Sequence, residues 1–422
     1  MRSVEEQQAR VAAAAVAPRP VRVAIAEAQG LMCAEEVVAE RPMPAFDQAA
    51  IDGYAVRSVD VYGADAIGDT SEGPGRDDEV VTLPVLGIIE AGARTPTRLQ
   101  PKLATRIQTG APMPTLADAV LPLRWTDGGN SRVRVLRGVR PGDYVRRVGD
   151  DVQPGDIAVR AGTVVGAAQV GLLAAVGRDR VLVHPRPRVS VLAVGGELVD
   201  VNRAPGNGQV YDVDSYALAA AARDAGAEVN RVGIVSNDPK KLREVVESQL
   251  SRAEVVVITG GVGGAAADEV RKVLSDLGDI EVSRIAMHPG SVQGFGQLGP
   301  EGVPTFLLPT NPLSALVIFE VMIRPLVRMS LGKREPMRRM VQARTLGPIA
   351  SMPGRKGYLR GQLMRDEQNG EYLVQVLGTS GSTSSHLLAT LAEANSLVVV
   401  PEEVEQIAAG EWVDVAFLAQ RG

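Results

Sequence analysis

The chain is poor in the residues that commonly build metal centres and covalent cross-links. It has one cysteine, Cys33, among 422 residues, which excludes an intramolecular disulfide and a multi-cysteine metal site. Its three histidines, His184, His288 and His386, form neither an HxH nor an HExxH pattern. The sequence therefore gives no support for a zinc site.

Long apolar segments are missing as well. No run approaches the roughly 18 apolar residues of a membrane-spanning helix. The first residues, Met1-Arg-Ser-Val-Glu-Glu, lack the apolar core of a signal peptide. We therefore expect a cytoplasmic protein without direct membrane insertion.

Positive charge does not dominate the composition. The formal net charge is −5 and the pI is about 5.5, which argues against a general nucleic-acid-binding protein but leaves room for a local basic pocket and a small anionic ligand. Neither a GxSxG elbow nor a full Walker A pattern occurs. The serine hydrolase and P-loop classes thus have no support.

The length predicts several domains. Short apolar runs cut by glycine, proline and aspartate predict a β-rich domain over residues 47–146 and a smaller β domain over 332–422. Between them, strands alternate with helices over residues 186–331, which predicts an α/β domain with a mostly parallel sheet covered on both faces. Residues 1–46 and 147–185 are expected to form a domain of an N-terminal helix (4–17) and linking segments.

Within the α/β region, apolar runs predict strands at 189–194, 232–235, 254–259 and 304–308. Helices are expected over 214–225 and over 313–331. A further helix is expected to begin near Pro239, and another, after the third strand, to end near residue 277. In such a sheet, ligands bind beyond the carboxyl ends of the strands. Those ends carry Gly195-Gly-Glu-Leu, Thr259-Gly-Gly-Val-Gly-Gly and Leu308-Pro-Thr-Asn-Pro. The alternative is that these glycines only permit tight turns.

Carboxylates at turns form a second candidate set. Several converging acids would hold Mg²⁺ through oxygen ligands. Isolated aspartates also commonly cap helices and shape turns, and sequence spacing does not decide between these roles. The candidates are Asp52, Asp151, Glu197, Asp212, Asp214, Asp238 and Asp268.

An ordered series of motifs resembles one known family. The segment Met43-Pro-Ala-Phe-Asp-Gln-Ala-Ala-Ile-Asp-Gly-Tyr-Ala-Val56 is similar to the pattern MPxFDNSAMDGYAV of the molybdopterin molybdenumtransferases, which include bacterial MoeA and the E domain of gephyrin. Further similar segments follow in the family's order as far as the last domain. They are Arg106-Ile-Gln-Thr-Gly-Ala-Pro-Met-Pro114, Gly149-Asp-Asp-Val, Val194-Gly-Gly-Glu-Leu, Gly260-Gly-Val, Pro309-Thr-Asn-Pro-Leu-Ser, Ser385-His386 and Gly410-Glu-Trp.

The resemblance implies an elongated homodimer with four subdomains per chain. It implies insertion of molybdate into adenylylated molybdopterin with Mg²⁺, at a site between the α/β domain of one protomer and the second domain of the other. By position, Asp52 and Thr109 would reach across the dimer, Glu197 and Asp268 would line the α/β pocket and hold Mg²⁺, and Asp151 is a further candidate. The implied ligand-binding turns contain Gly195, Gly260, Gly261, Pro289, Gly290, Pro309, Asn311, Pro312 and Ser314.

Several positions depart from the family patterns. Val194 and Gly196 replace the threonine and aspartate of TGDEL, Gly263 and Ala265 alter GGVSVG, and Thr310 stands at the glycine of PGNP. The turn KPGKP reads His288-Pro-Gly-Ser-Val292 and has lost both lysines. Hydrogen bonds to charged groups contribute roughly 1.5–3 kcal/mol each, so losing two predicts anion binding that is weaker by about a hundred- to ten-thousand-fold.

These losses favour an eroded pocket and a repurposed protein. By analogy with gephyrin, we expect a dimeric cytoplasmic scaffold that binds the cytoplasmic segment of a membrane receptor or a tubulin-like cytoskeletal protein. The alternatives are an active molybdopterin molybdenumtransferase, with Mg²⁺, molybdopterin-AMP and molybdate as its ligands, and a sensor that binds the pterin without metal insertion.

Overall fold

The computed structural model describes residues 1–16, 18–62, 64, 81–95, 97–263, 267–378 and 388–418. The chain divides into two compact units, one of residues 23–181 and one formed by residues 1–22 together with 182–422. The chain passes from one unit to the other within β1 (Val21–Ala24) and within β12 (Arg180–His184).

The unit of residues 23–181 is built on a five-stranded sheet with the order β8-β5-β7-β6-β9. Its core packs Tyr54, Leu121 and Val133. The sheet strands are β5 (Gly53–Val56), β6 (Thr82–Ile89), β7 (Ala104–Ile107), β8 (Ala119–Pro122) and β9 (Arg132–Arg134). The remaining elements are short: β2 (Met32–Cys33), β3 (Val37–Val38), β4 (Gln48–Ala49), β10 (Val145–Arg146), β11 (Ile157–Val159), α2 (Ala167–Ala175) and the 3₁₀ turns Ile25–Glu27, Ser58–Asp60 and Leu123–Trp125.

The second unit contains the expected α/β sheet, with the order β16-β13-β17-β21-β20-β18. Its first four strands are parallel, while β20 and β18 add an antiparallel edge that the sequence patterns did not predict. The strands are β13 (Arg188–Val194), β16 (Glu228–Val235), β17 (Val255–Val262), β18 (Gly278–Arg284), β20 (Val292–Leu298) and β21 (Val303–Pro309). Two short paired strands, β14 (Leu198–Val199) and β15 (Val210–Tyr211), follow β13.

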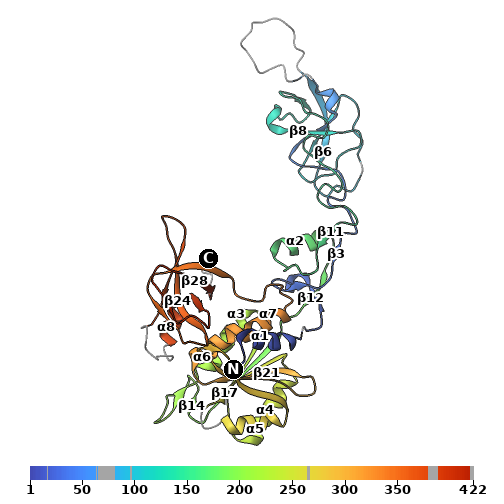
Figure 1. Ribbon diagram of the computed structural model, residues 1–422. Coiled ribbons are helices and arrows are strands. Elements are labelled where there is room, and N and C mark those ends of the chain that lie inside the picture. The colour runs from blue at the N-terminus through green and yellow to red at the C-terminus, as the bar shows by residue number, and fades with distance from the viewer. Residues whose placement is uncertain are drawn as a thin grey trace. The chain divides into compact units, whose positions relative to one another are not determined.

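Helices cover both faces of this sheet, as predicted (Figure 1). One face carries α4 (Pro239–Leu250) and α5 (Ala267–Ser275). The other carries α1 (Val4–Ala13), α3 (Asp214–Ala225) and a long helix made of α6 (Pro312–Ile318), a π-helical turn (Phe319–Ile323) and α7 (Arg324–Ser330). The first helix ends at Ala13 rather than near residue 17, because the amides of Ala14 and Ala15 bond three residues back and tighten the last turn.

The C-terminal part closes into a small barrel. Its strands are hydrogen-bonded to one another in the order β24-β25-β22-β28-β26, and β26 also pairs with β24, which closes the barrel. Their bounds are β22 (Met340–Thr345), β24 (Lys356–Arg365), β25 (Tyr372–Val376), β26 (Ser396–Val400) and β28 (Trp412–Phe417), accompanied by β23 (Ile349–Ala350), β27 (Gln406–Ile407) and α8 (Leu388–Glu393). Strand β19 (Met287–His288) joins this sheet by pairing with β24.

Within the described residues, none of the helices combines the length and apolar composition needed to cross a membrane.

Candidate functional site

The carboxyl end of β13 presents the exposed carboxylate of Glu197. Its side chain lies over Gly195, where a Cβ atom would stand 2.8 Å from Glu197 Oε2. The amide of Val210 donates to the Glu197 carbonyl at 2.9 Å. The glycine thus leaves room for the carboxylate, while the pairing of β14 with β15 fixes its backbone.

The glycines that end β17 are required by close packing. Gly260 has φ +91°, and a Cβ there would stand 2.0 Å from the Val194 carbonyl oxygen. At Gly261 a Cβ would meet Leu307 Cδ2 at 2.9 Å. Because neither residue has a side chain, β17 can lie this close to its neighbours. Both glycines therefore have a structural role.

The turn after β21 opens the long helix. Asn311 Oδ1 accepts a hydrogen bond from the Ser314 amide at 3.0 Å, and Pro312 occupies the first turn of α6. Thr310 is not among the non-glycine residues with positive φ. The threonine at the family's glycine position therefore introduces no left-handed backbone strain.

The turn 289–290 packs on the same helix. Gly290 has φ +91°, and a Cβ there would stand 2.6 Å from Ile318 Cγ1. The preceding His288 pairs in register with Gly357 of β24. Burial, together with the nearby Arg355, lowers the pKa of His288, so this histidine is neutral at pH 7. Arg355 is thus a cation close to His288.

Asp268 is an exposed carboxylate at the start of a helix. It lies in the first turn of α5, its side chain is 92% exposed, and it forms an ion pair with Arg271. The described residues contain no group of three or more histidine, cysteine or acidic side chains arranged to hold a metal ion. Among these described residues, Mg²⁺ would therefore meet at most one or two carboxylates, a mode that Mg²⁺ accepts when phosphate oxygens and water complete its shell.

In the other unit, the structure brings Asp52 and Thr109 together. Asp52 Oδ1 accepts hydrogen bonds from the Thr109 amide at 2.8 Å and from Thr109 Oγ1 at 2.7 Å. These bonds lower the pKa of Asp52, so it remains ionised at neutral pH. Asp151 is exposed, and its amide donates to the Met43 carbonyl at 3.0 Å.

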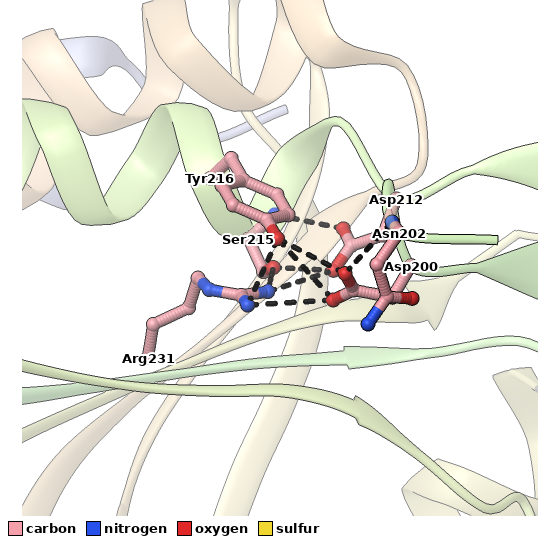
Figure 2. Close-up of polar contacts among 6 residues, drawn as sticks. All are labelled: Asp200, Asn202, Asp212, Ser215, Tyr216 and Arg231. Atoms are coloured by element: carbon pink, nitrogen blue, oxygen red, sulfur yellow. Dashed lines mark hydrogen bonds and ion pairs between the residues drawn. The ribbon is translucent and has the colours of Figure 1, made fainter.

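Sequence reasoning missed a polar cluster around Arg231 (Figure 2). The guanidinium of Arg231, from the middle of β16, contacts Ser215, Tyr216 and Asp200. The buried Asp212 accepts hydrogen bonds from both the amide and the hydroxyl of Ser215. Only Asp212 had been a sequence candidate, because nothing in the spacing brings Arg231 to these loops.

Two further candidates have distinct surroundings. Asp238 caps α4, with Oδ1 accepting from the Lys241 amide at 3.0 Å. Asp214 begins α3 as a buried carboxyl whose pKa is raised to about 7 by burial and by Asp212. Ala265, Ser385 and His386, which also belong to the motifs, lie outside the described residues.

Comparisons with known proteins cover the chain from end to end. Three family models match: the MoeA N-terminal region (domain I and II) over residues 2–177, a probable molybdopterin binding domain over 190–329, and the MoeA C-terminal region (domain IV) over 342–418. A protein of Mycobacterium tuberculosis named molybdopterin molybdenumtransferase 1 is 77% identical over 428 residues, covering 100% of both chains.

More distant relatives share the full length. Molybdopterin molybdenumtransferase 2 of the same organism is 38% identical, covering 98% of this chain and 99% of the relative. Among solved structures, a molybdopterin biosynthesis MoeA protein from Pyrococcus horikoshii is 29% identical with a TM-score of 0.79, covering 99% of each chain.

Proposed function

The chain belongs to the MoeA family, and on that premise we propose that it is an active molybdopterin molybdenumtransferase of molybdenum cofactor biosynthesis. It accepts adenylylated molybdopterin and molybdate, inserts the metal into the dithiolene of the pterin and releases AMP. The homodimer and the cytoplasmic location that the family implies are parts of this proposal.

One observation carries the proposal. The identity of 77% spans the whole chain of a relative that is named for this activity. The scaffold function expected from the altered motifs is therefore wrong, and with it the receptor and cytoskeletal partners drawn from gephyrin. That expectation added up the losses at the altered positions as if each removed a ligand, and the sum overestimated the loss of anion binding.

The structure offers physical reasons for the overestimate. Thr310 adopts an ordinary φ, so that substitution adds no backbone strain. Arg355 is near enough to lower the pKa of His288, so a permanent cation stands beside the turn that lacks the family's lysines. A guanidinium binds oxyanions through a fork of donors and keeps its charge at any physiological pH. We infer that Arg355 supplies part of the anion attraction.

Glu197 and Asp268 are the proposed Mg²⁺ ligands. Mg²⁺ would offset the negative charge of the phosphate-bearing substrate, while the substrate itself completes the coordination. Asp268 would exchange its exposed partner Arg271 for the metal. In the unit of residues 23–181, the ionised Asp52 orients the hydroxyl of Thr109. We propose that this pair contacts the substrate bound by the partner protomer, and that Asp151 also belongs to the site.

The polypeptide turns contribute backbone to the same site. We propose that the segments at Gly195, at Gly260 and Gly261, at Pro289 and Gly290, and at Pro309 receive the ligand. Asn311, Pro312 and Ser314 then hold the start of the long helix in place beneath it.

The test is a reconstituted reaction of the purified full chain with adenylylated molybdopterin, molybdate and Mg²⁺. We expect molybdenum cofactor to form with release of one AMP per turnover, and Glu197→Gln to reduce the rate at least about tenfold by removing one charged ligand. Asp276→Asn, at an exposed position of the same unit, is the matched control and should be silent. A folded wild-type protein that neither binds AMP at millimolar concentration nor forms cofactor would overturn the proposal.

A further inference from the structure

Arg231 contacts the residues that directly follow two short strands, β14 and β15 (Figure 2). Its Nη2 donates to Asp200 Oδ2 at 3.3 Å and to the Tyr216 hydroxyl at 3.1 Å, and its Nη1 donates to Ser215 Oγ at 3.1 Å. Nη1 also lies 3.8 Å from Asp212 Oδ2. The guanidinium stands 3.7 Å from the centroid of the Tyr216 ring. One side chain therefore contacts two carboxylates, two hydroxyls and an aromatic face.

The carboxylates of Asp200 and Asp212 lie at the carboxyl ends of β14 and β15, which together form a short two-stranded ribbon. Asp200 directly follows β14, and Asp212 directly follows β15. The strands pair in parallel, with Leu198 opposite Val210. At the start of the ribbon the Val210 amide bonds the carbonyl of Glu197, and at its end the Asp212 amide bonds the carbonyl of Val199. Glu197 thus opens a ribbon whose other end is fixed on Arg231.

The ribbon needs such an anchor. Each of its strands has two residues, and residues 201–209, which lie between them, are exposed. Two-stranded structures of this size are marginal on their own. Arg231 comes from β16, an outer strand of the six-stranded sheet, where it lies opposite Val191 of β13 next to a register shift, so it ties the ribbon to that sheet.

The chemistry of the anchor is specific to arginine. A planar guanidinium can donate to Asp200 and Ser215 while it stacks on Tyr216, whereas a lysine ammonium is a point charge that cannot do all three. The partly buried setting strengthens these contacts: side-chain exposure is 25% for Arg231 and 1% for Asp212.

We propose that Arg231 is a positioning residue for the transferase reaction, which holds Glu197 in its productive place through Asp200, Asp212 and the β14–β15 ribbon. This inference rests on the proposed function. Arg231 contacts no substrate in this account and acts through the backbone that carries Glu197. A misplacement of about 1 Å at a catalytic group lowers rates by about a hundredfold.

The test compares Arg231→Met and Arg231→Lys with wild type in the reconstituted reaction. Arg231→Met should lower kcat about ten- to a hundredfold with a much smaller change in KM, and Arg231→Lys should recover only part of the loss. Arg243→Met is the matched control, since Arg243 pairs with Glu247 and Asp276 on the opposite side of the sheet. That control should leave kcat unchanged.

A second arm separates positioning from stability. In a Glu197→Gln background, Arg231→Met should cost much less than in wild type, because both changes act on the same group. A residue needed only for stability would lower both backgrounds equally. Equal losses, or an unchanged kcat in a folded Arg231→Met protein, would overturn the inference.

A third arm reads the ribbon directly. Arg203 lies in the exposed connection between β14 and β15, so limited trypsin digestion should cut after Arg203 faster in Arg231→Met than in Arg243→Met. Equal cleavage rates would show that Arg231 does not anchor the ribbon. An inactive wild type would refute the proposed function instead, and the cleavage comparison would still decide whether the anchor exists.

Discussion

Asp214 provides a prediction that can be worked through to a magnitude. It begins α3 with 7% of its surface exposed, and its Oδ1 has no hydrogen-bond partner. Burial, together with the charge of Asp212, raises the pKa of Asp214 from 3.8 to about 7. The perturbation is Asp214→Asn, which keeps the shape and removes the charge.

The sign follows from proton linkage. The folded protein holds the Asp214 proton up to about pH 7, whereas the unfolded chain releases it near 3.8. Stability is thus greatest below the unfolded pKa, falls as the pH rises towards 7, and is constant above it. A shift of about three pKa units corresponds to at most about 4 kcal/mol. The N-terminal position on α3 offsets about 0.3–1 kcal/mol of this cost.

The assay is urea unfolding of wild type and Asp214→Asn between pH 5 and 8, with a probe in the α/β domain. The variant's stability relative to wild type should increase by about 2–3 kcal/mol across this interval. Asp276→Asn, at a position whose side chain is 61% exposed, should produce no such slope. Parallel curves for wild type and Asp214→Asn would refute the reasoning, because they would mean that Asp214 titrates alike in the folded and unfolded chains.

Three further changes have defined outcomes. Gly260→Ala should destabilise the α/β domain by at least about 2 kcal/mol in urea unfolding, since it places a Cβ 2.0 Å from a carbonyl oxygen at a positive φ; a shift below 0.5 kcal/mol would contradict the geometry. Thr109→Val should leave the melting temperature nearly unchanged yet lower kcat/KM about tenfold or more by releasing Asp52; unaltered kcat/KM would remove the pair from the site. Arg355→Ala should weaken AMP binding in calorimetry by about tenfold, with Arg365→Ala as the control, and equal affinities would remove Arg355 from the anion site.

The α/β elements were predictable because each had a strong local signal. The strands β13 and β17 are continuous apolar runs, and α4 begins with a capping Asp238 before Pro239. Strand β20, which lies between β21 and β18 in the sheet, carried the opposite signal. Gly294 and Gly296 interrupt its run of apolar residues. In the structure, a Cβ at Gly296 would stand 2.0 Å from the Asp279 carbonyl oxygen, so no side chain fits there. The close approach of the strands requires glycine at a position where the sequence pattern predicts the end of a strand.

The site was predictable only where a role is local. Glu197 after a strand, and Asp52 and Asn311 within family-like motifs, could be named as candidates from motif and position. Arg231 could not, because its contacts with Asp200 and Ser215 join segments separated by as many as 31 residues. No periodicity encodes such a contact, and it becomes visible only when β16 is placed beside β13.

The error about function has the same physical origin. The loss of two lysines was converted into weaker binding without a compensating cation, although electrostatic attraction depends on the total charge near the ligand and not on which residue supplies it. In the folded chain, the barrel strand β24 pairs with the turn strand β19 and brings Arg355 beside His288. A motif contains only charged residues that are close in sequence, whereas the electrostatic potential in a pocket depends on all charges that are close in space. Lost motif residues therefore indicate lost function only after the fold has been shown to place no substitute there.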